Sequence, residues 1–298
     1  MKTFLAWLAS VFRKKAAVSS PTGPDLLILG TAKAGTTSLF EFLNNLPGFS
    51  GALNKELRYF SMDHYYHQGT DWYHRQFEAG PPNIKFEATP HYLYFPAVAE
   101  RVHRYQYETG KTLKFIVLLR EPATRAYSAW NMERSFHQHR AVDIIENHYK
   151  YYNPDLRASL TNLLLQKEFP SFQQAVLDDI ERLNRHDPLL EPSYVRKGLY
   201  ARQILHWKKW FDLRHFLFLE VRELCEPALV IKKLEAFLGI KINPNTKLPA
   251  NAKLNRGQYE QIPNETTMQT LEMLKEFYRP YNKELFEILG KQFDWNVS

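Results

Sequence analysis

Residues 30–38 combine glycine, small hydroxyl side chains and one lysine, the residue types that bind phosphate. They follow a short apolar run at 26–29, typical of a buried parallel strand, and precede leucine and phenylalanine spaced as on one face of a helix. Backbone N–H groups and the helix dipole attract an anion at such a junction. The sequence therefore predicts a phosphate-binding loop; a tight glycine turn with a solvated Lys33 is the alternative.

This loop departs from the pattern of nucleoside-triphosphate sites. The pattern G-x-x-x-x-G-K-[ST] would place lysine at position 36, where the chain has Thr36, and its own lysine, Lys33, lies within the loop. A second buried strand, at 115–119, ends in Arg120 instead of a magnesium-binding aspartate. A guanidinium suits an additional phosphate, so we expect no metal ion to be required.

Two segments together give the sequence a specific resemblance. TAKAGTTSL at 31–39 and LLREPATRAYSAW at 118–130 resemble the nucleotide motifs of sulfotransferases that use 3′-phosphoadenosine 5′-phosphosulfate (PAPS), in particular the heparan-sulfate-type and related bacterial carbohydrate sulfotransferases. The likeness runs from about residue 26 to residue 295. It implies transfer of the sulfuryl group of PAPS to a carbohydrate or glycolipid, to a hydroxyl in preference to an amine.

The resemblance also assigns residues to the nucleotide. Arg120 and Ser128 match positions that contact the 3′-phosphate, and a guanidinium fork fits phosphate geometry. Lys33 would in addition stabilise the charge that develops on the leaving phosphate, which makes it a catalytic candidate. The phosphosulfate end falls to Lys33, Ala34, Gly35, Thr36, Thr37 and Ser38, and further nucleotide contacts fall to Tyr200, Lys253, Asn255, Arg256 and Gly257.

The segment NKELRYF at 54–60 resembles the family element K-E-x-x-F-F, whose glutamate is the general base. Glu56 would take the proton of the acceptor as the acceptor attacks sulfur in line with the leaving phosphate, and Lys55 would balance charge. As isolated residues, Lys55 and Glu56 are more typical of a solvated surface pair. Arg58 stands where the family often has histidine, which changes the expected acceptor contacts.

The segment FEATPHY at 86–92 resembles a family stretch, E-K-[ST]-P-x-Y, that lines the acceptor cleft. Ala88 replaces its lysine, so a cationic contact to an acidic sugar is missing and a heparan-like acceptor is not implied. Glu87 is a reserve candidate for the base. His91 has the chemistry for proton transfer, although a structural, hydrogen-bonded histidine is the more typical case.

The periodicity predicts the elements that must position these residues. Buried runs at 26–29, 115–119 and 216–221 alternate with helical patterns at 172–183, 200–211 and 229–238. This order favours an α/β fold, a P-loop-like parallel sheet flanked by helices on both faces. We expect one domain over 25–298, with a variable insertion or lid near 137–170 and a C-terminal helix broken at Pro280.

Composition limits the compartment and the partners. The 298 residues carry a net charge of +7, which favours polyanionic partners, and the single cysteine, Cys225, indicates a reducing, cytoplasmic location. Residues 1–24 form an extension whose apolar stretch is too short to span a bilayer and precedes its basic residues, unlike a signal peptide. An amphipathic helix touching a membrane surface and a packed or frayed terminus both fit it.

Two other functions would each account for some of these features. A small-molecule kinase would use the same strand, loop and helix, but this chain does not have the lysine at position 36 that such a kinase would need. A non-catalytic polyanion-binding protein would use the net positive charge and the aromatic residues, yet the sequence has no recognised nucleic-acid module. We therefore expect no nucleic-acid partner, and the sequence leaves the oligomeric state open.

Overall fold

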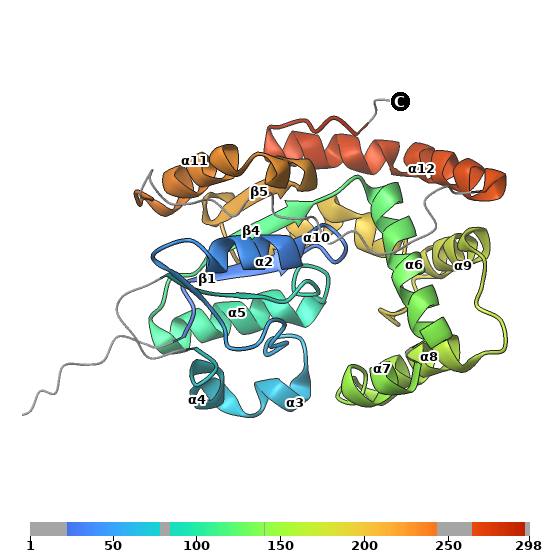
Figure 1. Cartoon of the computed structure of the whole chain (residues 1–298), viewed down its shortest axis with the longest axis horizontal. Coiled ribbons are helices and arrows are strands. Elements are labelled where there is room, and N and C mark those ends of the chain that lie inside the picture. Colours follow the sequence, from blue (N-terminus) through green and yellow to red (C-terminus); the bar gives the residue numbers. More distant parts are fainter. Residues whose placement is uncertain (1–22, 78–83, 140, 243–263, 296–298) are drawn as a thin grey trace, which may run out of the picture.

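The computed structural model describes residues 23–77, 84–139, 141–242 and 264–295. Their centre is a parallel sheet of five strands in the order β2-β3-β1-β4-β5 (Figure 1). The strands are β1 (Leu26–Gly30), β2 (Phe49–Gly51), β3 (Ile84–Ala88), β4 (Lys114–Leu119) and β5 (Phe216–Glu220). The predicted P-loop-like parallel sheet is confirmed, whereas β2 and β3 were not predicted as strands.

One face of the sheet is covered by α2 (Thr36–Asn44) and α11 (Pro227–Leu238). Leu39 and Leu43 of α2 and Leu234 of α11 are fully buried against alternate residues of the central strands. Since successive strand residues point to opposite faces, the apolar runs of β1 and β4 supply this layer and the layer behind it. Helices therefore lie on both faces, as predicted.

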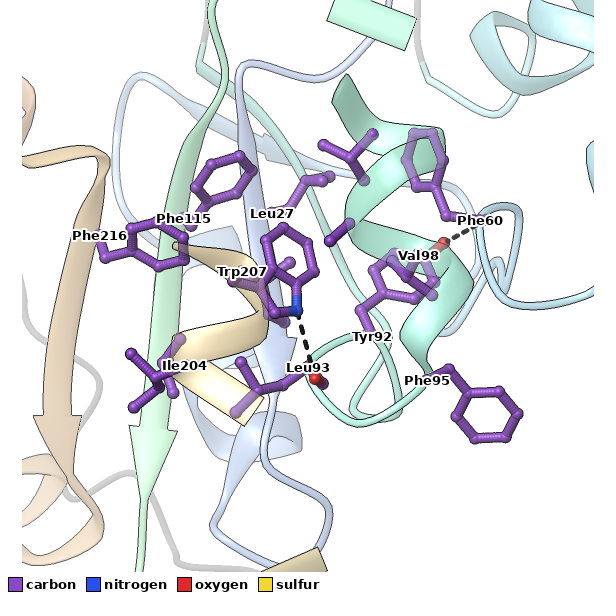
Figure 2. Close-up of a cluster of buried hydrophobic side chains, with 14 of the residues drawn as sticks. Leu27, Phe60, Tyr92, Leu93, Phe95, Val98, Phe115, Ile204, Trp207 and Phe216 are labelled. Atoms are coloured by element: carbon purple, nitrogen blue, oxygen red, sulfur yellow. Dashed lines mark hydrogen bonds between the residues drawn. The ribbon is translucent and has the colours of Figure 1, made fainter. Parts of the chain in front are cut away.

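The other face packs against α5 (Pro96–Thr109) and α10 (Tyr200–Trp207). Trp207 is completely buried among Leu27, Phe115 and Phe216, and its indole N–H donates to the carbonyl oxygen of Leu93 at 3.2 Å (Figure 2). This hydrogen bond satisfies the polar atom that so large a side chain brings into the core. It also fixes the segment after β3, which carries His91.

A third layer extends beyond the sheet and consists of α6 (Pro122–His139), α9 (Phe172–Asn184) and α12 (Glu265–Leu289). The predicted break at Pro280 is wrong, because α12 continues through this residue. Proline removes a single backbone hydrogen bond, while Leu274 and Tyr278 before it and Leu285 after it are all buried. Packing on both sides of the proline keeps the helix continuous.

The region predicted as an insertion forms α7 (Ala141–Asn147) and α8 (Pro154–Leu165), which pack on the end of α6 (Figure 1). Short helices complete the described chain: α3 (Asp63–Tyr66), α4 (Gly69–His74), and the 3₁₀ turns η1 (Arg196–Gly198), η2 (Leu213–His215) and η3 (Val221–Cys225). Among the described residues, no helix is long and apolar enough to cross a bilayer. The N-terminal amphipathic helix falls outside the described residues.

Candidate functional site

A cavity of about 1130 Å³ lies at the carboxyl ends of the strands. The segment after every strand contributes to its lining: Lys33 after β1, Glu56 after β2, His91 after β3, Arg120 after β4 and Arg222 after β5. In open α/β sheets ligands bind at this edge. The cavity therefore brings the two predicted motifs and the predicted acceptor segments to one place.

The loop between β1 and α2 is shaped by its backbone. Lys33 and Gly35 both adopt left-handed φ angles, of 70° and 94°. A Cβ atom at position 35 would meet Val221 Cγ2 at 3.2 Å and Leu224 Cδ1 at 3.3 Å, so glycine suits both the conformation and the space. Gly35 is also the N-cap of α2 and brings no side chain to the first-turn N–H groups of that helix.

The second motif is attached to this loop. Arg120 donates from Nη1 to the carbonyl oxygen of Lys33 at 3.1 Å and from Nε to Thr124 Oγ1 at 3.4 Å. Ser128 is buried on the cavity side of α6, one turn beyond Thr124. Lys33 Nζ lies 3.5 Å from the Met132 sulfur, which places the ammonium between the loop and α6. The two nucleotide motifs therefore form one continuous wall.

Arg125 is a residue of this wall that the sequence did not single out. Its side chain is fully buried and donates from Nη2 to the carbonyl oxygen of Tyr194, while Nε and Nη1 have no hydrogen-bond partner within the described chain. A buried guanidinium with unused donors is costly unless a ligand completes it. The resemblance of the segment RAYSAW at 125–130 to the family motif assigned a nucleotide contact to Ser128 and none to Arg125.

Tyr200 lies beneath the cavity and not in its lining. Its buried hydroxyl donates to the carbonyl oxygen of Arg120 at 2.8 Å, so it supports the end of β4. Burial raises its pKa, which keeps it a neutral donor. The other predicted nucleotide contacts, Lys253, Asn255, Arg256 and Gly257, lie outside the described residues.

The segment with Glu56 crosses the end of β3. The N–H of Glu56 donates to the carbonyl oxygen of Ala88 at 3.1 Å, and the N–H of Arg58 donates to Thr89 Oγ1 at 3.2 Å. Glu56 and Arg58 both have left-handed φ angles, of 65° and 57°. This tight path turns the Glu56 side chain into the lining of the cavity that also holds Lys33.

Two cations hold the Glu56 carboxylate. Lys55 Nζ lies 2.5 Å from Oε1, and Arg58 Nη2 lies 3.6 Å from Oε2. Arg58 also donates from Nη1 to the carbonyl oxygen of His148 and approaches the His148 ring with Nη2, each at 2.9 Å. The insertion, to which His148 belongs, therefore closes over the segment that carries Glu56.

Glu87, the reserve candidate for the base, lies in the core and not in the cavity lining. It accepts hydrogen bonds from the hydroxyls of Tyr73 at 2.5 Å, Tyr92 at 3.0 Å and Thr89 at 3.0 Å. Burial raises its pKa to about 7. These contacts aim both carboxylate oxygens inward, which fits a structural residue better than a base.

His91 does line the cavity, next to two carboxylates that the sequence did not predict as site residues, Glu133 and Glu191. Its Nδ1 lies 3.9 Å from Glu191 Oε1, and burial lowers its pKa well below the ordinary value. Glu191 is itself paired with Lys197, while Glu133 accepts a hydrogen bond from the Tyr194 hydroxyl.

Comparison with known proteins settles the family. The sequence model of the sulfotransferase domain family matches residues 23–289, which is most of the chain. This chain belongs to the sulfotransferase family. Its fold agrees with a solved sulfotransferase from Alicyclobacillus acidocaldarius, which has a TM-score of 0.62 and 23% identity over 92% of this chain and 99% of that one.

Curated relatives of the sulfotransferase include heparan sulfate glucosamine 3-O-sulfotransferases. Isoform 6 of Homo sapiens is 29% identical over 296 residues, covering 91% of this chain and 73% of the relative. Isoform 5 of Mus musculus is 24% identical over 289 residues, covering 91% and 74%. Together with the family match and the fold, they identify a PAPS-dependent enzyme and set the kinase and the non-catalytic polyanion-binding protein aside.

The residues of the cavity fit PAPS. The nucleotide carries phosphate groups on both the 5′ and the 3′ side of its ribose. The wall offers the glycine loop for one of them and Arg120 together with Ser128 for the other. Arg125 belongs to the same wall and is fully buried in it. Within the described ranges, no group of three or more histidine, cysteine, aspartate or glutamate residues could hold a metal ion.

Proposed function

We propose that this sulfotransferase transfers the sulfuryl group of PAPS to a hydroxyl of a carbohydrate or glycolipid, by in-line transfer with Glu56 as the base. The observation that carries the proposal is that Glu56 and Lys33 line one cavity, each held by a neighbour from a different segment. PAPS supplies the activated sulfuryl group. The carbohydrate acceptor follows from the names of the relatives, which sulfate a glycan.

The nucleotide half of the cavity is assigned to the loop after β1 and to residues at and beyond the end of β4, with distinct tasks. The loop from Lys33 to Ser38 holds the phosphosulfate end, and Lys33 offsets the charge that develops there as the sulfuryl group leaves. Arg120 and Ser128 hold the 3′-phosphate. The hydrogen bond from Arg120 to the Lys33 carbonyl couples the two ends, so that binding at one end orders the other.

Glu56 accepts the proton of the acceptor hydroxyl. Lys55 contacts one of its oxygens and Arg58 lies near the other, so the carboxylate is fixed in orientation before the acceptor arrives. A hydroxyl must lose its proton as its oxygen bonds to sulfur, and a positioned carboxylate contributes about 100-fold or more to such a step. Among the described carboxylates that line the cavity together with Lys33, Glu56 best fits the role of base.

Calorimetry with 3′-phosphoadenosine 5′-phosphate, the desulfated product nucleotide, tests the nucleotide assignment against ATP. We expect the wild type to bind the product nucleotide in preference to ATP, and Lys33→Ala to reduce turnover more than affinity. Lys241→Ala, whose side chain is 91% exposed, is the matched control and should change neither. A preference for ATP, or no nucleotide binding, would refute the assignment.

Replacement of Glu56 by glutamine tests the base. Glu56→Gln should retain affinity for the product nucleotide and lose about 100-fold or more in the rate of sulfate transfer. Glu100→Gln on the exposed side of α5 serves as the control and should keep the wild-type rate. Retained transfer by Glu56→Gln would move the role of base elsewhere, with His91 the next residue of the cavity to test.

We further propose a cytoplasmic enzyme with peripheral membrane contact through residues 1–24. The support is compositional: one cysteine, and a short apolar stretch followed by basic residues. Flotation of the full chain and of a chain lacking residues 1–24 with anionic vesicles tests the contact. Equal flotation of the two would contradict it.

A further inference from the structure

The turn between α7 and α8, residues 148–153, contacts the chain that follows β2. His148 in this turn accepts hydrogen bonds from Arg58 through its carbonyl oxygen and its ring. Three residues further on, the Tyr151 ring stacks on His64 of α3, with centroids 3.8 Å apart and an interplanar angle of 6°. The insertion is therefore attached at two points to the chain after β2.

One nitrogen of Arg58, Nη2, is near both His148 and Glu56. It lies 2.9 Å from His148 Nδ1 and 3.6 Å from Glu56 Oε2. A guanidinium donates hydrogen bonds and never accepts them, so Nδ1 of His148 is the acceptor of this pair. At 3.6 Å the contact with Oε2 is too long for a hydrogen bond. Arg58 therefore lies near the carboxylate without occupying this oxygen.

Oε2 of Glu56 is in a position to take the proton of an acceptor. The Glu56 side chain is 28% exposed and lines the cavity, and Lys55 holds its other oxygen, Oε1, at 2.5 Å. Without His148, Nη2 of Arg58 would be free to move onto Oε2, since guanidinium and carboxylate form strong charged hydrogen bonds. Cations would then hold both oxygens, and one of these contacts would have to break before the proton could transfer.

We propose that His148 is a positioning residue for sulfate transfer: it holds Arg58 away from Glu56 Oε2 and so keeps this oxygen available to the acceptor hydroxyl. The inference rests on the proposed function, in which Glu56 is the base. Because His148 belongs to the insertion, Glu56 is ready only while the insertion lies over it. Closure of the insertion thereby completes the reactive group.

Rates of sulfate transfer from labelled PAPS by the full chain test this role, with heparan sulfate, cellobiose and galactosylceramide as trial acceptors and the fastest one used throughout. His148→Ala should lower kcat about tenfold, the factor for one charged hydrogen bond, with little change in acceptor KM or in affinity for the product nucleotide. His148→Gln, whose side-chain oxygen can accept from Arg58, should keep most of the wild-type kcat. His103→Ala, at an exposed histidine of α5 outside the cavity lining, is the matched control and should change neither constant.

A double variant separates this role from a merely structural one. Arg58→Met removes the guanidinium but keeps an unbranched side chain, so in the His148→Ala background it should restore most of the lost kcat. A histidine that only stabilised the insertion would give no such recovery. Absence of recovery, or an unchanged kcat in His148→Ala, would overturn the inference.

Glu56→Gln in the same assay distinguishes failure of this inference from failure of the proposed function. Loss of transfer in Glu56→Gln leaves the proposed base standing, whatever the His148 variants do. Retained transfer in Glu56→Gln, or no transfer by the wild type to any of the three acceptors, would contradict the proposed function and this inference with it.

Discussion

At the scale of single residues, Glu56 and Glu87 show that glutamates from two family segments have different tasks. Glu56 and Glu87 both match family segments, yet Glu56 lines the cavity and Glu87 accepts three hydroxyl hydrogen bonds in the core. The alternation of β3 accounts for this: Phe86 and Ala88 face one layer of helices, and Glu87 points to the opposite one, where Tyr73 and Tyr92 lie. A carboxylate there is held partly protonated at neutral pH.

This burial predicts a pH dependence of stability. Since the pKa of Glu87 rises from 4.5 to about 7 on folding, the folded chain binds more protons between these values, and its contribution to stability falls as pH rises through that window. Relative to Glu87→Gln, the free energy of unfolding of the wild type should drop by about 3 kcal/mol from pH 4.5 to pH 7. Urea unfolding over this range measures it.

Glu133 has a similarly raised pKa but is present in both proteins, so its effect cancels in that difference. Parallel stability curves for the wild type and Glu87→Gln would show that Glu87 does not titrate in this window.

Much of the candidate site could be predicted from residues in motifs, and the remainder could not. Lys33, Arg120, Ser128, Glu56 and His91 all line the cavity, as their segments suggested. The residues that were missed are Arg125, in the first turn of α6 and within the second nucleotide motif, Glu133, later in the same helix, and Glu191, from a stretch without periodicity. Only the folded chain brings Glu133 and Glu191 to the cavity, so no local spacing could reveal them.

At the scale of elements, the nucleotide loop depends on Gly35, which has a left-handed φ angle and little space for a Cβ atom. Gly35→Ala should be destabilising by about 1–3 kcal/mol because alanine disfavours a φ of 94° and its Cβ would press on Val221 and Leu224. It should also weaken binding of the product nucleotide, since α2 begins at this position. Chemical unfolding and calorimetry measure the two effects.

Gly48→Ala is the matched control for this prediction. Its φ of 87° is equally left-handed, but nothing lies within 4 Å of its added Cβ. It should cost stability through backbone strain alone and leave nucleotide affinity unchanged. Equal effects of the two variants on nucleotide binding would show that the loop does not depend on the fit of Gly35.

The elements that sequence patterns predicted well are those with long apolar runs or clear helical stripes. The two strands that were not predicted, β2 and β3, have the weakest apolar patterns. β2 has three residues, and β3 interleaves Lys85 and Glu87 with apolar residues. A period-two pattern over so few residues is hard to distinguish from a loop, and Glu87 is polar although it is fully buried. Tertiary hydrogen bonds, not hydropathy, make β3 a core strand.

At the scale of the whole molecule, the cavity draws on all five strands, so nucleotide binding should stabilise the sheet as one unit. Saturation with the product nucleotide at about 1,000 times its dissociation constant adds about 4 kcal/mol to the folded state. Differential scanning calorimetry should show one transition moving to higher temperature. Its shift should be smaller for Lys33→Ala at the same concentration. A second transition that does not move would show that part of the described chain folds apart from the site.

The order of the strands has a consequence for how this enzyme could change over time. Because β1 is central, the loop that holds the nucleotide lies between β4, which leads to Arg120, and β3, which leads to His91. The two halves of the reaction are thus encoded on opposite sides of a single strand. Substitutions after β2 and β3 or in α7 and α8 can retune the acceptor while the nucleotide side stays intact, so acceptor preference is open to drift and to directed evolution where donor preference is not.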